Sequence, residues 1–274
     1  MGEARRAESE GSGRRPFALA NWKMAMTIGE SRAFVARLLA IAGDLPRKVE
    51  MVLCPPCTAL YAVSQALAAW PIAVGAQNLS PHRGASYTGQ VSAELVADAG
   101  CRWALLGHWE VRRYLGDDDA LVNRKIHRAL ATGLCPVVSV GEGTGRREQA
   151  AADLERQLPV VLEGCTADQV GKMVFLYEPE WTIGVEKPAP LAHVQVGCQT
   201  IRSWLQARYG PDAAERARII YGGSVSAEFA AELLDIPDVD GLGVARRGRD
   251  PEGWMAVVRL IAGQRGGSRH NDHL

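Results

Sequence analysis

The sequence predicts a single (β/α)8 barrel, an α/β fold in which eight parallel strands alternate with helices around a closed core. Its length of 274 residues suits one such domain, since these barrels typically need about 250 residues. Short apolar runs recur along the whole chain, with amphipathic, helix-like segments between them. Polar residues gather where several of these runs end, which is the position of the active site in barrels of this kind.

Composition and charge narrow the class of protein. Hydrophobic residues make up 47% of the chain and charged residues 23%, as in an ordinary globular protein. The 31 basic and 31 acidic residues balance, so neither nucleic acid nor an anionic membrane is expected as the main partner. No apolar run is long enough to span a bilayer, and residues 1–15 lack the apolar stretch of a secretory signal. We therefore expect a cytoplasmic protein with a disordered tail over residues 1–15, the barrel over 16–264 and a polar tail over 265–274.

The six cysteines are expected to be reduced thiols, because five of them lie in or beside apolar runs or predicted helices. Cys54 and Cys57 have the spacing of a redox motif, but two prolines separate them and no second pair supports a metal site. We interpret this segment as a strand end followed by a turn. Neither a metal nor a cofactor is predicted.

In the first half of the chain, four strands and the helices behind them are expected. Thr27 and Glu30 have the spacing of a capping box, which predicts the start of the first helix. A long polar loop over residues 77–90 interrupts the alternation. The strands are predicted over residues 17–23, 50–54, 72–76 and 102–106, and further helices over 58–69 and 91–99.

The second half continues the same alternation. Asp118 begins a helix with an acidic first turn, which suits the helix dipole, and the last helix carries an apolar stripe over residues 254–261. Strands are predicted over residues 136–140, 173–178, 218–221 and 239–244, with helices over 118–131, 146–163 and around 194–205. A doubly wound sheet is the alternative fold, but the third glycine of residues 141–145 comes one position early for its dinucleotide-binding pattern.

Candidate functional residues lie at the predicted C-terminal ends of five strands. Glu178 directly follows a buried strand, where a carboxylate is costly to bury and packing does not need it. Pro179 stiffens the chain behind it and Gly184 lets the backbone turn again, which favours a catalytic base beneath a movable lid. The other candidates are Asn21 and Lys23 after the first strand, His108 after the fourth, Gly223 and Ser224 after the seventh, and Ala245 and Arg246 after the eighth.

Each of these residues also has a structural interpretation, since a polar residue after a strand is most often solvated, His108 could cap a helix, and a glycine pair could be only a turn. Taken together they favour proton transfer next to a carbonyl group. A carboxylate would take a proton from carbon, an imidazole would hydrogen-bond the oxygen, and a lysine would stabilise the developing charge. Exposed backbone amides at Gly223, at Ser224 and at the start of the segment after the eighth strand would hold a phosphate dianion.

Four segments resemble the signatures of the triosephosphate isomerase family. They are residues 20–24 (Ala-Asn-Trp-Lys-Met), 106–110 (Leu-Gly-His-x-Glu), 177–184 (Tyr-Glu-Pro-x-Trp-x-Ile-Gly) and 221–224 (Tyr-Gly-Gly-Ser). They occur in the family's order and at similar spacing, and residues 75–78 and 88–89 are similar to its interface loop. The similarity covers about residues 17–262, nearly the whole chain.

The resemblance implies a role for each candidate in the interconversion of dihydroxyacetone phosphate and glyceraldehyde 3-phosphate through an enediolate. In this family a Glu base works with a neutral His electrophile. Glu178 would be that base and His108 the electrophile. Lys23 would bind substrate and stabilise the enediolate, with Asn21 assisting and Glu110 lying beside Lys23.

The resemblance also implies a lid, a phosphate site and a partner. The lid would be residues 179–187, latched by Tyr221 and Ser224, and its closure would exclude water. Thr88 would reach into a neighbouring subunit, so a homodimer through the 77–90 loop is implied. The phosphate group would be held by Gly184, Gly223, Ser224, Ala245 and Arg246.

Several positions depart from the family's pattern. Trp109 replaces the small Ser that usually follows the catalytic His, Val111 and Gln90 replace an ion pair, and Ala245-Arg246 replaces a Gly-Gly that offers bare amides to phosphate. In the lid, residues 180, 182 and 186 are normally small or apolar. Ser139 replaces a common Cys, which we expect to matter little.

These departures leave two alternatives open. One is an isomerase of a four-carbon ketose phosphate, converting L-erythrulose 1-phosphate to D-erythrulose 4-phosphate. The other, which the intact set of Glu178, His108 and Lys23 disfavours, is a barrel that binds a sugar phosphate without catalysis.

Overall fold

The computed structural model describes residues 13–185, 188–225 and 227–264. Most of the two predicted tails, and Glu186 and Lys187 of the predicted lid, lie outside these residues. Arg14, near the end of the predicted N-terminal tail, contacts the barrel, because its Nε donates a hydrogen bond to Asp240 at 2.6 Å.

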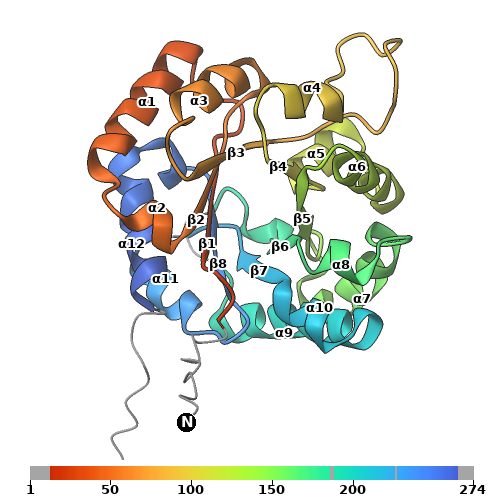
Figure 1. The fold of residues 1–274 in the computed structure, drawn as a ribbon. Coiled ribbons are helices and arrows are strands. Elements are labelled where there is room, and N and C mark those ends of the chain that lie inside the picture. Colours follow the sequence, from red (N-terminus) through yellow and green to blue (C-terminus); the bar gives the residue numbers. More distant parts are fainter. Residues whose placement is uncertain (1–12, 186–187, 226, 265–274) are drawn as a thin grey trace, which may run out of the picture.

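The strands close into one parallel barrel, which confirms the predicted fold and excludes the doubly wound sheet (Figure 1). Each strand pairs in parallel with the next, and β8 returns to β1 through the register Phe17 to Gly241. The strands are β1 (Phe17–Asn21), β2 (Glu50–Cys54), β3 (Ile72–Ala76), β4 (Trp103–Leu106), β5 (Cys135–Val140), β6 (Val174–Tyr177), β7 (Arg218–Tyr221) and β8 (Gly241–Val244).

Helices surround the strands (Figure 1). The predicted capping box is confirmed, since Thr27 caps the first helix and Glu30 reaches back to it. The helices are α1 (Ile28–Ile41), α2 (Leu45–Lys48), α3 (Leu60–Ala66), α4 (Ala93–Asp98), α5 (Trp109–Leu115), α6 (Asp119–Ala131), α7 (Ala150–Val161), α8 (Ala167–Val170), α9 (Leu191–Tyr209), α10 (Pro211–Arg216), α11 (Ala227–Leu234) and α12 (Pro251–Gln264). Short 3-10 turns lie at η1 (Cys57–Ala59), η2 (Arg147–Gln149), η3 (Glu180–Thr182) and η4 (Arg247–Arg249).

Several short helices were not predicted separately, and their composition explains why. Helices α2 and α8 have four residues each, too few to display a helical period. Helix α5 contains no buried residue, so it has no apolar stripe to recognise. None of the helices in the described part of the chain is long and apolar enough to cross a membrane.

Alternate residues of the strands divide the core into two layers. Phe17 and Leu19 pack with residues of other strands inside the barrel, whereas Ala18 and Ala20 pack outward with the helices. The strand segments are therefore largely apolar, and most polar side chains of the site come from the last residues of the strands or from just beyond them.

The segment from Cys54 to Cys57 is a strand end followed by a turn, as predicted. Cys54 is the last residue of β2 and Cys57 begins the 3-10 turn η1. Both thiols are free, and burial raises the pKa of the Cys54 thiol above its usual value. A thiol that resists ionisation in this way is a poor redox nucleophile.

Candidate active site

A cavity of about 630 Å³ opens at the C-terminal end of the barrel. The predicted site residues that line it are Asn21, Lys23, His108, Glu178, Gly184, Gly223, Ser224, Ala245 and Arg246. The barrel thus brings together side chains from five strand ends that the sequence separates widely. Glu110 lies beside the cavity, in contact with Lys23.

Glu178 and His108 face each other in this cavity. Oε2 of Glu178 lies 3.4 Å from Nε2 of His108, and the two residues are only 6% and 3% exposed. The same carboxylate oxygen accepts a hydrogen bond of 3.3 Å from the hydroxyl of Ser139, on β5. Ser139, whose replacement of a common Cys was expected to matter little, thus contacts the carboxylate of the proposed base.

The carboxylate of Glu178 is favoured in its ionised form. Burial on its own raises the pKa of Glu178, but the His108 imidazole, Lys23 and the Ser139 hydroxyl together lower the pKa below its usual value. An ionised carboxylate that is buried yet held by several partners is suited to accept a proton.

His108 is both a helix cap and a site residue. Its Nδ1 accepts a hydrogen bond from the backbone N–H of Glu110 at 3.1 Å, so it begins helix α5 and carries its ring proton on Nε2. Burial lowers the pKa of His108, while the facing carboxylate of Glu178 raises it, and the net direction is upward. The acceptor role of Nδ1 nevertheless favours a neutral ring that donates from Nε2 into the cavity.

Lys23 is held in a strained backbone conformation. Its φ of 54° lies in the left-handed region, which costs free energy for a residue with a Cβ and is often found at functional sites. Its N–H donates to Asn21 Oδ1 at 3.0 Å, its carbonyl accepts from Gln77 Nε2 at 2.9 Å, and its Nζ lies 2.6 Å from Glu110 Oε1. These three contacts stabilise the turn that carries the ammonium group into the cavity.

Two glycines at the rim have conformations or contacts that other residues could not adopt. Gly184 has φ +81° and Gly223 has φ +122°, both unfavourable for other residues. A Cβ on Gly223 would lie 2.3 Å from Oγ1 of Thr182, in the predicted lid. Arg246 lines the same rim, and its Nη2 donates to the carbonyl of Val185 at 2.7 Å.

Hydrogen bonds hold the chain near the start of the predicted lid and just beyond its end. Two residues past the lid, the N–H of Ala189 donates to the hydroxyl of Tyr221 at 3.0 Å. Near its start, Trp181 Nε1 donates to Glu142 Oε1 at 2.7 Å, and the Tyr177 hydroxyl donates to Glu142 Oε2 at 3.1 Å. Glu142 was missed by sequence reasoning, although it shares the signal that identified Glu178, a carboxylate just beyond a buried strand.

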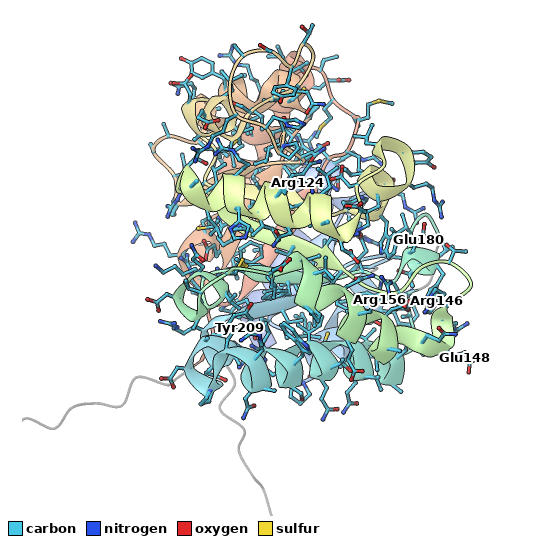
Figure 2. The ribbon with its side chains drawn as sticks, turned by 90° about the vertical axis from the view of Figure 1, so that its right-hand side faces the viewer. Arg124, Arg146, Glu148, Arg156, Glu180 and Tyr209 are labelled. Carbon is cyan, nitrogen blue, oxygen red and sulfur yellow. The ribbon has the colours of Figure 1, made fainter. Side chains whose placement is uncertain are left out.

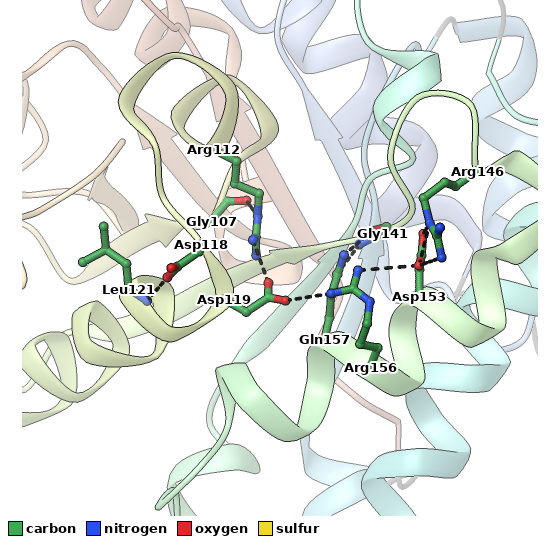
Figure 3. Close-up of polar contacts among 10 residues, drawn as sticks. All are labelled: Gly107, Arg112, Asp118, Asp119, Leu121, Gly141, Arg146, Asp153, Arg156 and Gln157. Carbon is green, nitrogen blue, oxygen red and sulfur yellow. Dashed lines mark hydrogen bonds and ion pairs between the residues drawn. The ribbon is translucent and has the colours of Figure 1, made fainter.

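Charged residues of helices α5, α6 and α7 form a network that includes Gly107, the residue before His108 (Figure 3). Arg112 Nε donates to the carbonyl of Gly107, next to His108, and Arg112 Nη1 donates to Asp119, both at 2.7 Å. Asp119 also pairs with Arg156, on α7 (Figure 3). The residue preceding His108 is thereby fixed from two neighbouring helices.

A second contact in Figure 3 holds the backbone of Gly141, which passes close to the backbone of Glu178. The amide of Gln157 both accepts from the N–H of Gly141 at 3.1 Å and donates to its carbonyl at 2.6 Å. A Cβ on Gly141 would lie 2.5 Å from the carbonyl oxygen of Glu178. Gly141 is therefore required where the chain after β5 passes the backbone of Glu178.

Comparisons with known proteins give a consistent result. The profile of the family described as triosephosphate isomerase matches residues 16–261. Triosephosphate isomerase of Symbiobacterium thermophilum is 39% identical over 251 residues, covering 91% of this chain and 98% of the relative. That of Chloroflexus aurantiacus is 42% identical over 245 residues, covering 89% and 98%. The crystal structure of triosephosphate isomerase from Bartonella henselae superposes with a TM-score of 0.80 at 30% identity, covering 90% of this chain and 98% of that one.

Proposed function

The chain belongs to the triosephosphate isomerase family, and from this premise we propose that it interconverts dihydroxyacetone phosphate and glyceraldehyde 3-phosphate. The observation that carries this proposal is the 3.4 Å approach of Glu178 Oε2 to His108 Nε2 inside the cavity. This pair unites a proton acceptor and a hydrogen-bond donor within reach of one small substrate.

The two side chains have complementary tasks in the proposed reaction. Glu178 removes a proton from the carbon beside the carbonyl group and returns it to the adjacent carbon. Nε2–H of His108 donates to the carbonyl oxygen, and the Lys23 ammonium stabilises the negative charge that develops there. Asn21 assists by holding the N–H of Lys23 at 3.0 Å, and Glu110 orients Lys23 through the ion pair at 2.6 Å.

The phosphate group is proposed to lie at the opposite side of the cavity. Gly184, Gly223 and Ser224 line the cavity, as do Ala245 and Arg246 on the loop after β8. Amide groups and a guanidinium are suitable donors for a phosphate dianion. The lid over residues 179–187 would cover the substrate, exclude water and suppress loss of phosphate from the intermediate.

A homodimer in the cytoplasm completes the proposal. The 77–90 loop extends outward, with Tyr87 43% exposed and stacked on His82 at a centroid distance of 4.0 Å. Thr88 at its tip would enter a neighbouring subunit. Sedimentation velocity on the full chain tests this, and a monomer at micromolar concentration would exclude the dimer.

The activity is tested by a comparison of substrates in deuterated water. We expect turnover of dihydroxyacetone phosphate, with deuterium from the solvent appearing on the substrate carbon. Parallel assays with L-erythrulose 1-phosphate test the four-carbon alternative, which none of the relatives described above supports. Binding of the triose phosphate without exchange of its C–H proton would instead indicate a non-catalytic barrel.

A further inference from the structure

The indole of Trp109 joins the two sides of the candidate active site. Trp109 directly follows His108, and its Nε1 donates to the backbone carbonyl of Glu178 at 2.7 Å. The indole is half-buried, and the guanidinium of Arg112 lies 5.6 Å from its ring centroid. One side chain thus links the residue beside the imidazole to the main chain of the facing carboxylate.

One helical turn further along α5, Arg113 reaches the same segment. Arg113 Nη2 pairs with Oε1 of Glu180, and the other oxygen of Glu180 accepts from the N–H of Thr144 at 2.6 Å. Positions four apart lie on one face of a helix, so Trp109 and Arg113 approach residues 178–180 side by side. A Cβ on Gly143 would lie 3.5 Å from Glu180 Oε2 and 3.8 Å from the Trp109 indole. The side chains of Glu180 and Trp109 therefore both pack against Gly143.

We propose that Trp109 is a positioning residue for the proton transfer, and that Arg113 acts with it as a clamp on the first hinge of the lid. The Trp109 indole fixes the backbone of Glu178 so that its carboxylate remains opposite His108. Arg113 fixes the next turn through Glu180. Trp109 and Glu180, two departures from the family's pattern, thereby belong to a single contact surface. This inference rests on the proposed function, because it names residues that serve that reaction.

The physical basis is the geometry that proton transfer requires. A misplacement of about 1 Å between reacting groups can cost about a hundredfold in rate. Glu178 is followed by Pro179 and by the lid, so any movement at the start of the lid would move its carbonyl and its side chain together. Trp109, the first residue of α5, directly follows His108 and donates to the Glu178 carbonyl. One helix therefore sets the distance between the imidazole and the carboxylate.

The first experiment compares Trp109→Phe with Trp70→Phe in the full chain. Trp109→Phe keeps an aromatic ring but removes the N–H donor together with part of the indole's contact area, and Trp70→Phe makes the same change before β3, at the opposite end of the barrel. We expect Trp109→Phe to lower kcat about tenfold with little change in KM, since one hydrogen bond to the reacting geometry is lost. The melting temperatures of the two variants should differ little from the unchanged chain.

The pH profile separates positioning from a merely structural role. Contacts with His108, Lys23 and Ser139 lower the pKa of Glu178. If the carboxylate becomes mobile, these contacts weaken and its pKa rises. The acid limb of kcat/KM should therefore move to higher pH in Trp109→Phe and stay in place in Trp70→Phe. Unchanged kcat and an unchanged acid limb in Trp109→Phe would overturn the proposal.

The second experiment tests the clamp through Arg113→Met, with Arg124→Met as its control. Arg124 is an exposed arginine on α6, away from the lid (Figure 2). We expect Arg113→Met, and not the control, to raise the share of substrate lost as inorganic phosphate. A looser hinge holds the enediolate less firmly, so its electron pair more often expels phosphate with the electrons of the broken C–O bond and leaves an unsaturated carbonyl product. Equal phosphate release in both variants would remove Arg113 from the proposal.

A readout without catalysis keeps this proposal separate from the proposed function. In nitrogen-15 spectra the indole N–H of Trp109 should exchange with solvent more slowly than that of Trp70. Slow exchange in a chain without isomerase activity would leave the contact standing and refute the function. Fast exchange of the Trp109 N–H in an active chain would refute the proposed role of Trp109 and leave the proposed function standing.

Discussion

Oε2 of Glu178, beyond β6, lies 3.4 Å from Nε2 of His108, beyond β4, and both residues are buried. The strands between and beside them hold this spacing, because β5 pairs with both β4 and β6. The expected effects below follow from this relationship and from the contacts around it.

Shortening the carboxylate should reduce turnover severely. Glu178→Asp withdraws the carboxylate by about one bond length, which is expected to lower kcat by at least about two to three orders of magnitude. Steady-state assays measure the effect, and Glu148→Asp, at an exposed residue of η2 (Figure 2), is the matched control. Turnover of Glu178→Asp close to that of the control would eliminate Glu178 as the base.

The activity of the unchanged chain should persist at mildly acidic pH. The pKa of Glu178 is lowered, as His108, Lys23 and Ser139 outweigh the effect of burial. A base with a lowered pKa stays ionised until the pH falls below the ordinary Glu value of about 4.3. Measured kcat/KM, which reports the free enzyme, should therefore show no loss attributable to Glu178 between about pH 7 and 5. A carboxylate limb above pH 6 would contradict this assignment.

Removal of the Ser139 hydroxyl should raise the pKa of the base. Ser139→Ala deletes a donor to the Glu178 carboxylate, so the acid limb of kcat/KM should move upward, with a loss of kcat of a few-fold at neutral pH. Thr200→Ala, on the outer helix α9, removes a hydroxyl from a helix surface and serves as the control. Identical profiles for both variants would show that Ser139 does not tune the base.

Loss of the far latch should open the lid. Tyr221→Phe removes the hydroxyl that accepts from the N–H of Ala189 at 3.0 Å, so the segment just beyond the lid loses that bond. We expect a higher KM and more inorganic phosphate released per turnover, since water then reaches the intermediate. Tyr61→Phe, an exposed residue of α3, should change neither quantity.

Stability should depend on Asp153 in a pH-dependent way. The bond to Arg146 is the main cause that lowers the pKa of Asp153, whose side chain is 1% exposed. A lowered folded-state pKa stabilises the protein above the unfolded value, about 3.9, and this contribution is lost as pH falls through the folded value. Asp153→Asn should lower Tm at pH 7, and the difference from the unchanged chain should shrink below about pH 4. A difference independent of pH would mean that packing, not charge, explains the effect.

The sequence by itself determined the barrel and the main members of the site. Apolar runs of four to six residues that alternate with helix-like segments favour buried strands. In a parallel barrel, the polar residues just beyond such strands share one end. The strands over 50–54, 72–76 and 218–221 were predicted with the bounds that the structure has. The candidates Asn21, Lys23, His108 and Glu178 line the cavity for the same reason.

Only the tertiary structure decided which side chains support these residues. Ser139 and Trp109 reach Glu178, and Glu142 reaches the lid, through contacts between neighbouring strands and loops. No local pattern encodes which residue each of them contacts. The short helix α5 buries no residue of its own. It matters for the site because it follows β4 directly, which places Trp109 next to the backbone of Glu178. Periodicity reports which face of a segment is buried, whereas a hydrogen bond such as that from Trp109 to the Glu178 carbonyl depends on how two distant segments are placed by the closed barrel.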